Sequence, residues 1–326
     1  MAENAASIHT VTNAAGKVWA PILCRFVPNE ILQIIQQYTL NASCRRIEDA
    51  EHLSAAGFRS VLITIPIVHP EGLTRVSALA SQAELTVVID HFRHAELLSQ
   101  ALLAAVLSAS LSADVLIDVD LGRRVTGVRP GPDSALLAAA IARLPNIRLR
   151  GVYVDVRECT TTGPNGSALS FEESIGVAAH CRRIIEAGGI PCAEIVSGQS
   201  HVAALSAMSA VTVVMASPLS AGTKSTGQGA AHLNDNSKAA LELVCSVVSR
   251  PSLEWCVIDA GRLSWGDARY LQVLHPSGAR LLHALPEVAT LQLSGESMDL
   301  RIGDTVILSH PDFAERLHLM SSREIH

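Results

Sequence analysis

The sequence predicts an α/β protein in which a parallel (β/α)8 barrel of the TIM type is followed by a smaller β-rich domain. The chain has 326 residues, of which 48% are hydrophobic and 17% charged, so it can bury a large core. Short apolar runs alternate with segments of helical spacing over most of the chain, and this alternation stops after about residue 250. Together, the length, the alternation and its end predict one large and one small domain.

The predicted strands are short runs rich in Val, Ile and Leu. They are apolar almost without interruption, which is typical of parallel strands that are covered on both faces. Eight runs fit this description: residues 17–24, 38–43, 60–68, 85–91, 114–120, 148–157, 193–197 and 211–215.

The predicted helices occupy the segments between these runs. Their apolar residues recur at helical spacing, and local signals such as Gly131-Pro132 at a start and Gly188-Gly189 at an end support the boundaries. The seven segments are residues 29–37, 48–56, 70–82, 94–107, 132–143, 171–187 and 201–208. Strands that alternate with helices in this way predict a closed barrel with the helices outside.

The domain boundary is expected in a polar stretch. Residues 218–237 are rich in Ser, Gly, Thr and Asn and are predicted to form a loop, and residues 238–249 are predicted to form a helix. From residue 253 onward, strand-like runs are separated by turns. We therefore expect a barrel domain over residues 1–236 and a β domain over residues 237–326.

Composition argues against two classes of partner and leaves a small-molecule substrate as the expectation. Lys and Arg number 25 against 31 Asp and Glu, and aromatic residues make up 3%, which argues against nucleic acid and anionic membranes as partners. No apolar run approaches the roughly 20 residues of a membrane span, and no secretory signal is visible, so a cytoplasmic protein is expected. The seven scattered cysteines form no CxxC pair and predict neither disulfides nor a cysteine zinc site.

Candidate reactive residues lie where the predicted strands end, because the active site of such barrels forms at the carboxyl ends of the strands. This rule selects Cys24 and Arg25, His91, Asp118 and Asp120, Asp155 and Arg157, residues 197–200, and Ser217. Each has a purely structural alternative: Asp118 and Asp120 could form a salt bridge at the barrel end, and Cys24 could be an inert buried thiol.

A candidate metal site lies near the end of the chain. His310 and Asp312 are two residues apart after an apolar strand, so their side chains project to the same side and both can reach one divalent cation, Zn or Mn. With thirteen histidines in the chain, a chance H-x-D pair is the alternative.

Several segments, in order, resemble the D-threonine aldolase and D-serine dehydratase-like family, whose barrel is of the alanine racemase type. The similar segments are residues 115–122 with 126–128, 149–152, 196–198, 247–251, 257–261 and 300–304, and the H-x-D pair. The resemblance implies a homodimer that uses pyridoxal 5'-phosphate and a divalent metal on β-hydroxy D-amino acids. It assigns His310 and Asp312 to the metal. The candidate cofactor residues are Ser197 and Gly198, which match the family's phosphate segment, and Ser217, which is selected by its position after the last barrel strand.

The lysine that forms the Schiff base in this family has no clear counterpart. Cys24 stands where the family has that lysine, and a thiol cannot form the imine. The chain contains three lysines, Lys17, Lys224 and Lys238, and Lys17 would need a shift of about seven residues to reach the position.

Three more positions of the cofactor pocket depart from the family pattern. Residues 199–202 replace the family's phosphate cradle, Asp155 stands near the place of a ring-contacting tyrosine, and Val125 replaces an arginine. These departures predict that the scaffold has lost pyridoxal phosphate.

Three functions are compatible with the sequence. The first is a divergent, metal-dependent lyase-like enzyme without pyridoxal phosphate that acts on a small, amino-acid-like substrate, with Cys24, Asp118 and Asp155 as candidate catalytic residues. The second is a pyridoxal phosphate-dependent D-amino acid aldolase or dehydratase that uses Lys17. The third is a non-catalytic binding or partner subunit.

Overall fold

The structure, a computed structural model, describes residues 2–23, 25, 27–105, 111–122, 125–156, 170–198, 202–216, 218, 242–265 and 271–309. The chain forms two compact units, Met1–Leu219 and Ser220–His326. The predicted domain boundary, between residues 236 and 237, lies outside the described residues.

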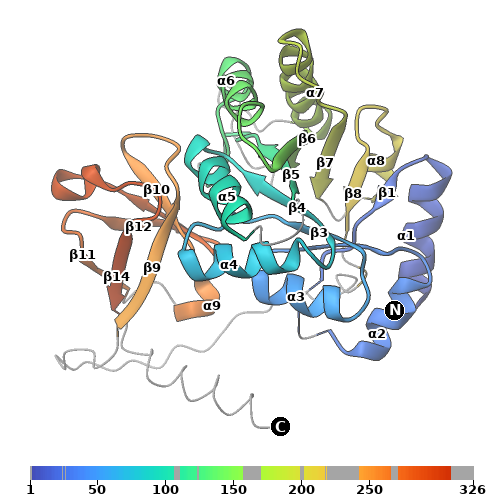
Figure 1. The fold of residues 1–326 in the computed structure, drawn as a ribbon, viewed down its shortest axis with the longest axis horizontal. Helices are drawn as coiled ribbons and strands as arrows, with labels where there is room; N and C mark the ends of the chain where they lie inside the picture. The colour runs from blue at the N-terminus through green and yellow to red at the C-terminus, as the bar shows by residue number, and fades with distance from the viewer. Residues whose placement is uncertain are drawn as a thin grey trace. The chain divides into compact units, whose positions relative to one another are not determined.

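The first unit is the predicted parallel barrel. Its eight strands pair in the order β1-β8-β7-β6-β5-β4-β3-β2, and helices lie outside them (Figure 1). All of these pairings are parallel. The strands are β1 Val18–Trp19, β2 Asn41–Cys44, β3 Ser60–Ile63, β4 Glu84–Ile89, β5 Ala113–Asp118, β6 Ile147–Asp155, β7 Glu194–Gly198 and β8 Val213–Met215.

The ring closes between the segment after β1 and strand β2. An isolated parallel bridge joins Ile22 to Ser43, and the amides of Leu23 and Ser43 donate hydrogen bonds to the carbonyls of Ser43 and Pro21 at 2.9 and 2.8 Å. On the other side of β1, only Val18 and Trp19 pair with β8. The first strand is therefore shorter than residues 17–24, its predicted span.

The helical layer contains one helix that the sequence did not reveal. Helices α2 to α8 lie within or near the seven predicted segments, and α1, Ala2–Ala14, precedes the first strand and packs against α8, β1 and α2. The eighth helix of the layer thus comes before β1. The others are α2 Asn29–Gln36, α3 Ile47–Ala55, α4 Pro70–Leu79, α5 Phe92–Ala104, α6 Pro132–Ile141, α7 Phe171–Ala187 and α8 Val202–Ala207.

Alternation along the strands separates two cores. Outward residues such as Ile63, Ile117 and Ile195 pack against the helices. Inward residues form a separate cluster inside the barrel: Ala20, Leu62, Val88, Leu116, Tyr153, Val196, Val213 and Met215. The barrel centre is therefore filled by side chains, and a small molecule can enter only at its ends.

An ion network around Arg150 lies at the amino-terminal end of the barrel. Its guanidinium donates to Glu194 Oε1 at 2.7 Å, to Thr86 Oγ1 at 3.3 Å and to Asp114 Oδ2 at 3.5 Å. Arg148 also binds Asp114, but its side chain is 77% exposed against 33% for Arg150. This end of the barrel thus serves stability.

We expect Arg150→Ala to destabilise the protein by about 1–3 kcal/mol, because half-buried carboxylates lose a charged donor. Urea unfolding measures the change. The matched control is Arg148→Ala, which removes an exposed ion pair to the same aspartate and should cost less than about 1 kcal/mol. Equal losses in the two variants would contradict the role of Arg150.

The second unit is an antiparallel β domain, as predicted. Six strands within the described residues of this unit pair in the order β11-β14-β9-β10-β13-β12 around a core that includes Val247, Ile258 and Trp265. The elements are β9 Glu242–Ser249, β10 Trp255–Ile258, α9 Arg262–Trp265, β11 Gln272–His275, β12 Arg280–Ala284, β13 Ala289–Gln292, the 3₁₀ helix η2 Gly295–Asp299 and β14 Thr305–Ser309.

The predicted helix over residues 238–249 is wrong, because Glu242–Ser249 forms strand β9. The strand pairs with β14 on one side and β10 on the other. Cys245 and Val247 are buried while Val244 is 65% exposed, a period of two that the Ala-Ala-Leu start of the segment obscures.

None of the helices in the described residues is long and apolar enough to cross a membrane.

Candidate active site

Four aspartates occupy the carboxyl ends of three neighbouring strands. Asp90 follows β4, Asp118 ends β5, Asp120 lies just beyond it, and Asp155 ends β6. Inward-facing Val88, Leu116 and Tyr153 each precede one of them by two residues, so the aspartates project into the barrel mouth as well. Functional sites of this barrel class form at the same end.

Asp118 is the most deeply buried of the four, with 4% of its surface exposed. The hydroxyl of Thr126 donates to its Oδ2 at 2.5 Å. Burial raises the pKa of Asp118 well above its usual range, and the negative charges of Asp90, Asp120 and Asp155 raise it further, against the hydrogen bond from Thr126. Asp118 is therefore suited to hold a proton and to donate it.

The two carboxylate oxygens of Asp90 have different neighbours. Its Oδ1 lies 3.0 Å from Nδ1 of His94 in helix α5, and its Oδ2 accepts a hydrogen bond from the amide of Gly127 at 2.8 Å. Both side chains are buried. Nδ1 thus lies between two groups of Asp90: the amide, which donates to it at 3.4 Å, and the closer carboxylate oxygen.

The segment that contains Thr126 and Gly127 folds back beside the end of β5. Val128 exchanges backbone hydrogen bonds of 2.9 Å with Asp118 and Asp120. Gly127 has a φ of +111°, and a Cβ there would lie 2.4 Å from the amide nitrogen of Asp120. Only glycine fits this close approach, which brings one donor to Asp90 and one to Asp118.

The predicted cofactor residues of β7 are placed as follows. Gly198 pairs with Asp155 in the sheet, so its backbone lies at the mouth. Ser197 alternates with inward-facing Val196 and thus faces the helical layer, where its hydroxyl is buried without a hydrogen-bond partner in the described part of the chain. The Ser197 side chain does not enter the mouth, and its cofactor role stays a prediction.

Several predicted site residues lie outside the described residues: Cys24, Ser217, His310 and Asp312. Within the described ranges, no group of three or more His, Cys, Asp or Glu side chains is arranged to hold a metal ion. The metal site at His310 and Asp312 remains a prediction from the sequence.

Lys17 lies at the wrong end of the barrel for the alternative that makes it a Schiff-base lysine. It precedes β1, and its Nζ donates to the carbonyl of Ser209, ahead of β8, at 3.4 Å. This is the amino-terminal end of both strands, opposite to Asp118. Lys224 and Lys238 lie outside the described residues. With four aspartates at the mouth and no lysine there, the described residues do not fit pyridoxal phosphate.

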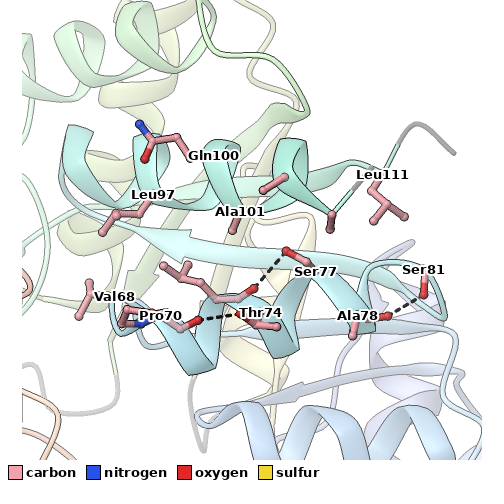
Figure 2. A pocket seen from close by; sticks show the side chains of 13 residues that line it. Val68, Pro70, Thr74, Ser77, Ala78, Ser81, Leu97, Gln100, Ala101 and Leu111 are labelled. Atoms are coloured by element: carbon pink, nitrogen blue, oxygen red, sulfur yellow. Dashed lines mark hydrogen bonds between the residues drawn. The ribbon is translucent and has the colours of Figure 1, made fainter. Parts of the chain in front are cut away.

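A groove on the outside of the barrel is not part of this site. It has a volume of about 830 Å³ and runs between α4 and α5 (Figure 2). Thr74, Ser77 and Ser81 turn their hydroxyls back onto carbonyls of their own helix segment, and apart from these and Gln100 the lining is mostly apolar. No titratable side chain of the described residues lines the groove, so the candidate active site is the barrel mouth.

Sequence reasoning selected Asp118, Asp120 and Asp155 but missed Asp90 and His94. His91, which it did select, caps helix α5 and accepts a hydrogen bond from the amide of Arg93. The available signal was the spacing of four residues between an aspartate after a strand and a histidine in the following helix.

An alanine racemase-type barrel is the class that this fold defines. The chain belongs to the alanine racemase N-terminal domain family, whose model matches residues 3–214. This match confirms the barrel type that the sequence motifs indicated.

The chain is similar in sequence to two curated proteins. The chain is 25% identical over 226 residues to a D-threonine aldolase from Arthrobacter sp, covering 67% of this chain and 57% of that protein. It is 24% identical over 135 residues to 3-hydroxy-D-aspartate aldolase from Paracoccus denitrificans, covering 40% and 34%. The matches thus span less than two thirds of either relative.

A solved structure extends the likeness to the second unit. The crystal structure of D-threonine aldolase from Filomicrobium marinum matches with a TM-score of 0.57 and 20% identity, over 97% of this chain and 86% of that one. At this identity the match shows a shared fold.

Proposed function

We propose that the protein is a divergent, metal-dependent lyase-like enzyme that acts on a small amino-acid-like substrate without pyridoxal phosphate. The observation that carries this proposal is Asp118, a buried acid at the barrel mouth among three other carboxyl groups. Carboxyl groups whose environments separate their protonation states can serve as a general acid and a general base.

The chemistry that fits this arrangement is the elimination of water from a β-hydroxy acid. Asp155, in its ionised form, removes the proton from the carbon next to the substrate carboxylate. Asp118 donates its proton to the hydroxyl on the adjacent carbon as the carbon–oxygen bond breaks. Water leaves, a carbon–carbon double bond forms, and the two aspartates have exchanged their protonation states.

Arginines beyond β1 and β2 support an acidic, amino-acid-like substrate. Arg25 follows β1 and Arg45 follows β2, across the ring from β5 and β6, whereas Arg46 is the N-cap residue of α3 and interacts with Glu48 and Asp49. Arg25 and Arg45 supply the positive charge that attracts a substrate carboxylate. Asp118 and Asp155 then act on the remainder of the molecule.

The metal is proposed from the sequence alone, because His310 and Asp312 lie outside the described residues. A divalent ion held by His310 and Asp312 would act as a Lewis acid toward the substrate oxygens. A homodimer, which the family resemblance implies, also belongs to the proposal.

We expect chelation of divalent metal to abolish turnover of β-hydroxy amino acids, and Zn²⁺ or Mn²⁺ to restore it. His310→Ala should lower both metal content and turnover, because it removes one of two protein ligands. The measurement is elemental analysis of the purified full chain alongside product formation. His283→Ala is the matched control, because His283 is an exposed histidine of β12 in the same unit.

The same experiment separates the alternatives. Turnover only after addition of pyridoxal phosphate, with a visible imine absorbance that a lysine substitution removes, would replace the proposal by cofactor chemistry. Metal-free protein without turnover, in which His310→Ala leaves ligand binding intact, would favour a non-catalytic binding subunit.

A further inference from the structure

We propose that Asp90 and His94 are positioning residues that keep Asp118 in its acid form by holding an ionised carboxylate beside it. The inference rests on the proposed function for its catalytic meaning, because Asp118 is the proton donor there. Its physical content, a charge fixed next to Asp118, can be measured without any substrate.

Strand register places the two aspartates side by side. The pairs Val88–Leu116 and Ile89–Ile117 align β4 with β5, so the next pair along the ladder is Asp90 and Asp118. Adjacent strands are about 4.8 Å apart, and side chains at paired positions project to the same face. Two buried carboxyl groups this close do not both ionise readily.

The contacts decide which of the two ionises. Asp90 accepts a hydrogen bond from the Gly127 amide at 2.8 Å, which stabilises its carboxylate, and its other oxygen lies 3.0 Å from Nδ1 of His94, where a proton on the ring adds to that stabilisation. Asp118 has one hydroxyl neighbour, Thr126, and a hydroxyl can accept as well as donate. The negative charge therefore resides on Asp90, and the proton on Asp118.

The surroundings of both groups agree with this assignment. Asp118 is faced by Asp90, which follows β4, and by Tyr153 and Asp155 of β6. From the segment after β5 it is faced by Asp120 and Thr126. Asp90 is faced by Asp118, by His94, and by His91, whose ring lies 6.1 Å from that of His94.

The His94 ring turns Nδ1 toward Asp90. With Nδ1 turned to Asp90, its Nε2 is buried and has no hydrogen-bond partner among the described residues. An unpartnered buried nitrogen costs free energy, so the orientation must be stabilised by the carboxylate on the other side of the ring.

The test is the titration of Asp118 in the resting full-length protein, followed by carbon NMR of labelled aspartate carboxyls. The signal is assigned by its loss in Asp118→Asn. We expect Asp90→Asn to raise the acid dissociation constant of Asp118 at least about tenfold, because a fixed negative charge on the neighbouring strand is removed. The matched control is Asp114→Asn, on the same strand as Asp118 but at the other end of the barrel, which should leave that constant unchanged.

A second pair of variants tests His94 and guards against misfolding of Asp90→Asn. His94→Leu removes the imidazole beside the Asp90 carboxylate and should shift the titration of Asp118 in the same direction. His94→Asn places an N–H near the position of Nδ1 and should restore it, a rescue that a merely space-filling role does not predict.

Two results would overturn the proposal: an unchanged Asp118 titration in folded Asp90→Asn, or the same shift in His94→Asn as in His94→Leu. Because no substrate is present, these results are independent of the proposed lyase activity. If the titration shifts as expected and no β-hydroxy amino acid is turned over, the positioning pair stands and the proposed function fails.

Discussion

Asp118→Asn is expected to lower turnover by about 10²- to 10⁴-fold, the usual contribution of a general acid, and to make the protein more resistant to alkaline pH. An amide cannot supply the proton that the leaving hydroxyl needs. It can, however, still accept the hydrogen bond from Thr126, so the local packing is retained.

The pH effect follows from the direction of the pKa shift. Burial and the neighbouring aspartates raise the pKa of Asp118 in the folded protein above its value in the unfolded chain. The folded state therefore binds this proton more tightly, and the stability that this provides is fully present below the ordinary aspartate pKa. That stability is lost as the pH rises through the raised pKa. Asparagine does not titrate, so the variant lacks this loss.

Two measurements check the prediction. Urea unfolding of parent and variant from acidic to alkaline pH should show the variant gaining relative stability as the pH rises, and turnover at neutral pH should show the loss of activity. Asp114→Asn is the control, because it neutralises a carboxylate of the same strand outside the mouth. A fully active Asp118→Asn variant would rule out Asp118 as the acid.

Gly127→Ala is expected to destabilise the protein by about 2–6 kcal/mol, the sum of backbone strain and steric overlap. The φ of +111° is unfavourable for alanine, and the new Cβ would lie 2.4 Å from the amide nitrogen of Asp120 and 2.9 Å from Cα of that residue. Relief of this overlap must displace the amide that binds Asp90.

The Gly131→Ala variant separates the cost of backbone strain from the cost of steric overlap. Gly131 also has a positive φ, +91°, but a Cβ there meets no atom within 4 Å, so the substitution should cost only the strain, about 1–3 kcal/mol. Thermal and urea unfolding compare the two variants. Equal losses would show that the close approach at Gly127 does not matter.

The barrel could be predicted from the sequence because its strands are apolar on both faces. The runs at Val115–Ile117 and Val152–Val154 are almost completely buried, so their composition reports their location directly. Register and closure could not be predicted, since the two-residue strand β1 and the bridge at Ile22 have no periodic signal.

Helix α1 and strand β9 are the two elements that the local hydrophobic pattern did not predict. Helix α1 buries Ala5 and Thr12, residues that give little amphipathic contrast, and it is recognised by its packing against α8 and β1. Strand β9 begins after an Ala-Ala-Leu segment with helical propensity, and pairing on both edges overrides that propensity.

The candidate site was predictable to the extent that strand ends could be located. Asp118 and Asp155 follow directly from that rule. The pair of Asp90 and His94, and the donors from Thr126 and Gly127, depend on how the segments after β4 and β5 fold back, which no spacing in the sequence specifies.

The narrow attachment of β1 affects how the barrel assembles. Val18 and Trp19 pair with Val213 and Val214, which are nearly two hundred positions later in the chain, and Ile22 meets Ser43 by a single bridge. During synthesis, the seven later strands can form an open curved sheet before the circle is complete. Joining contacts so distant in sequence is slow, and so the final step of folding should be the docking of the first strand.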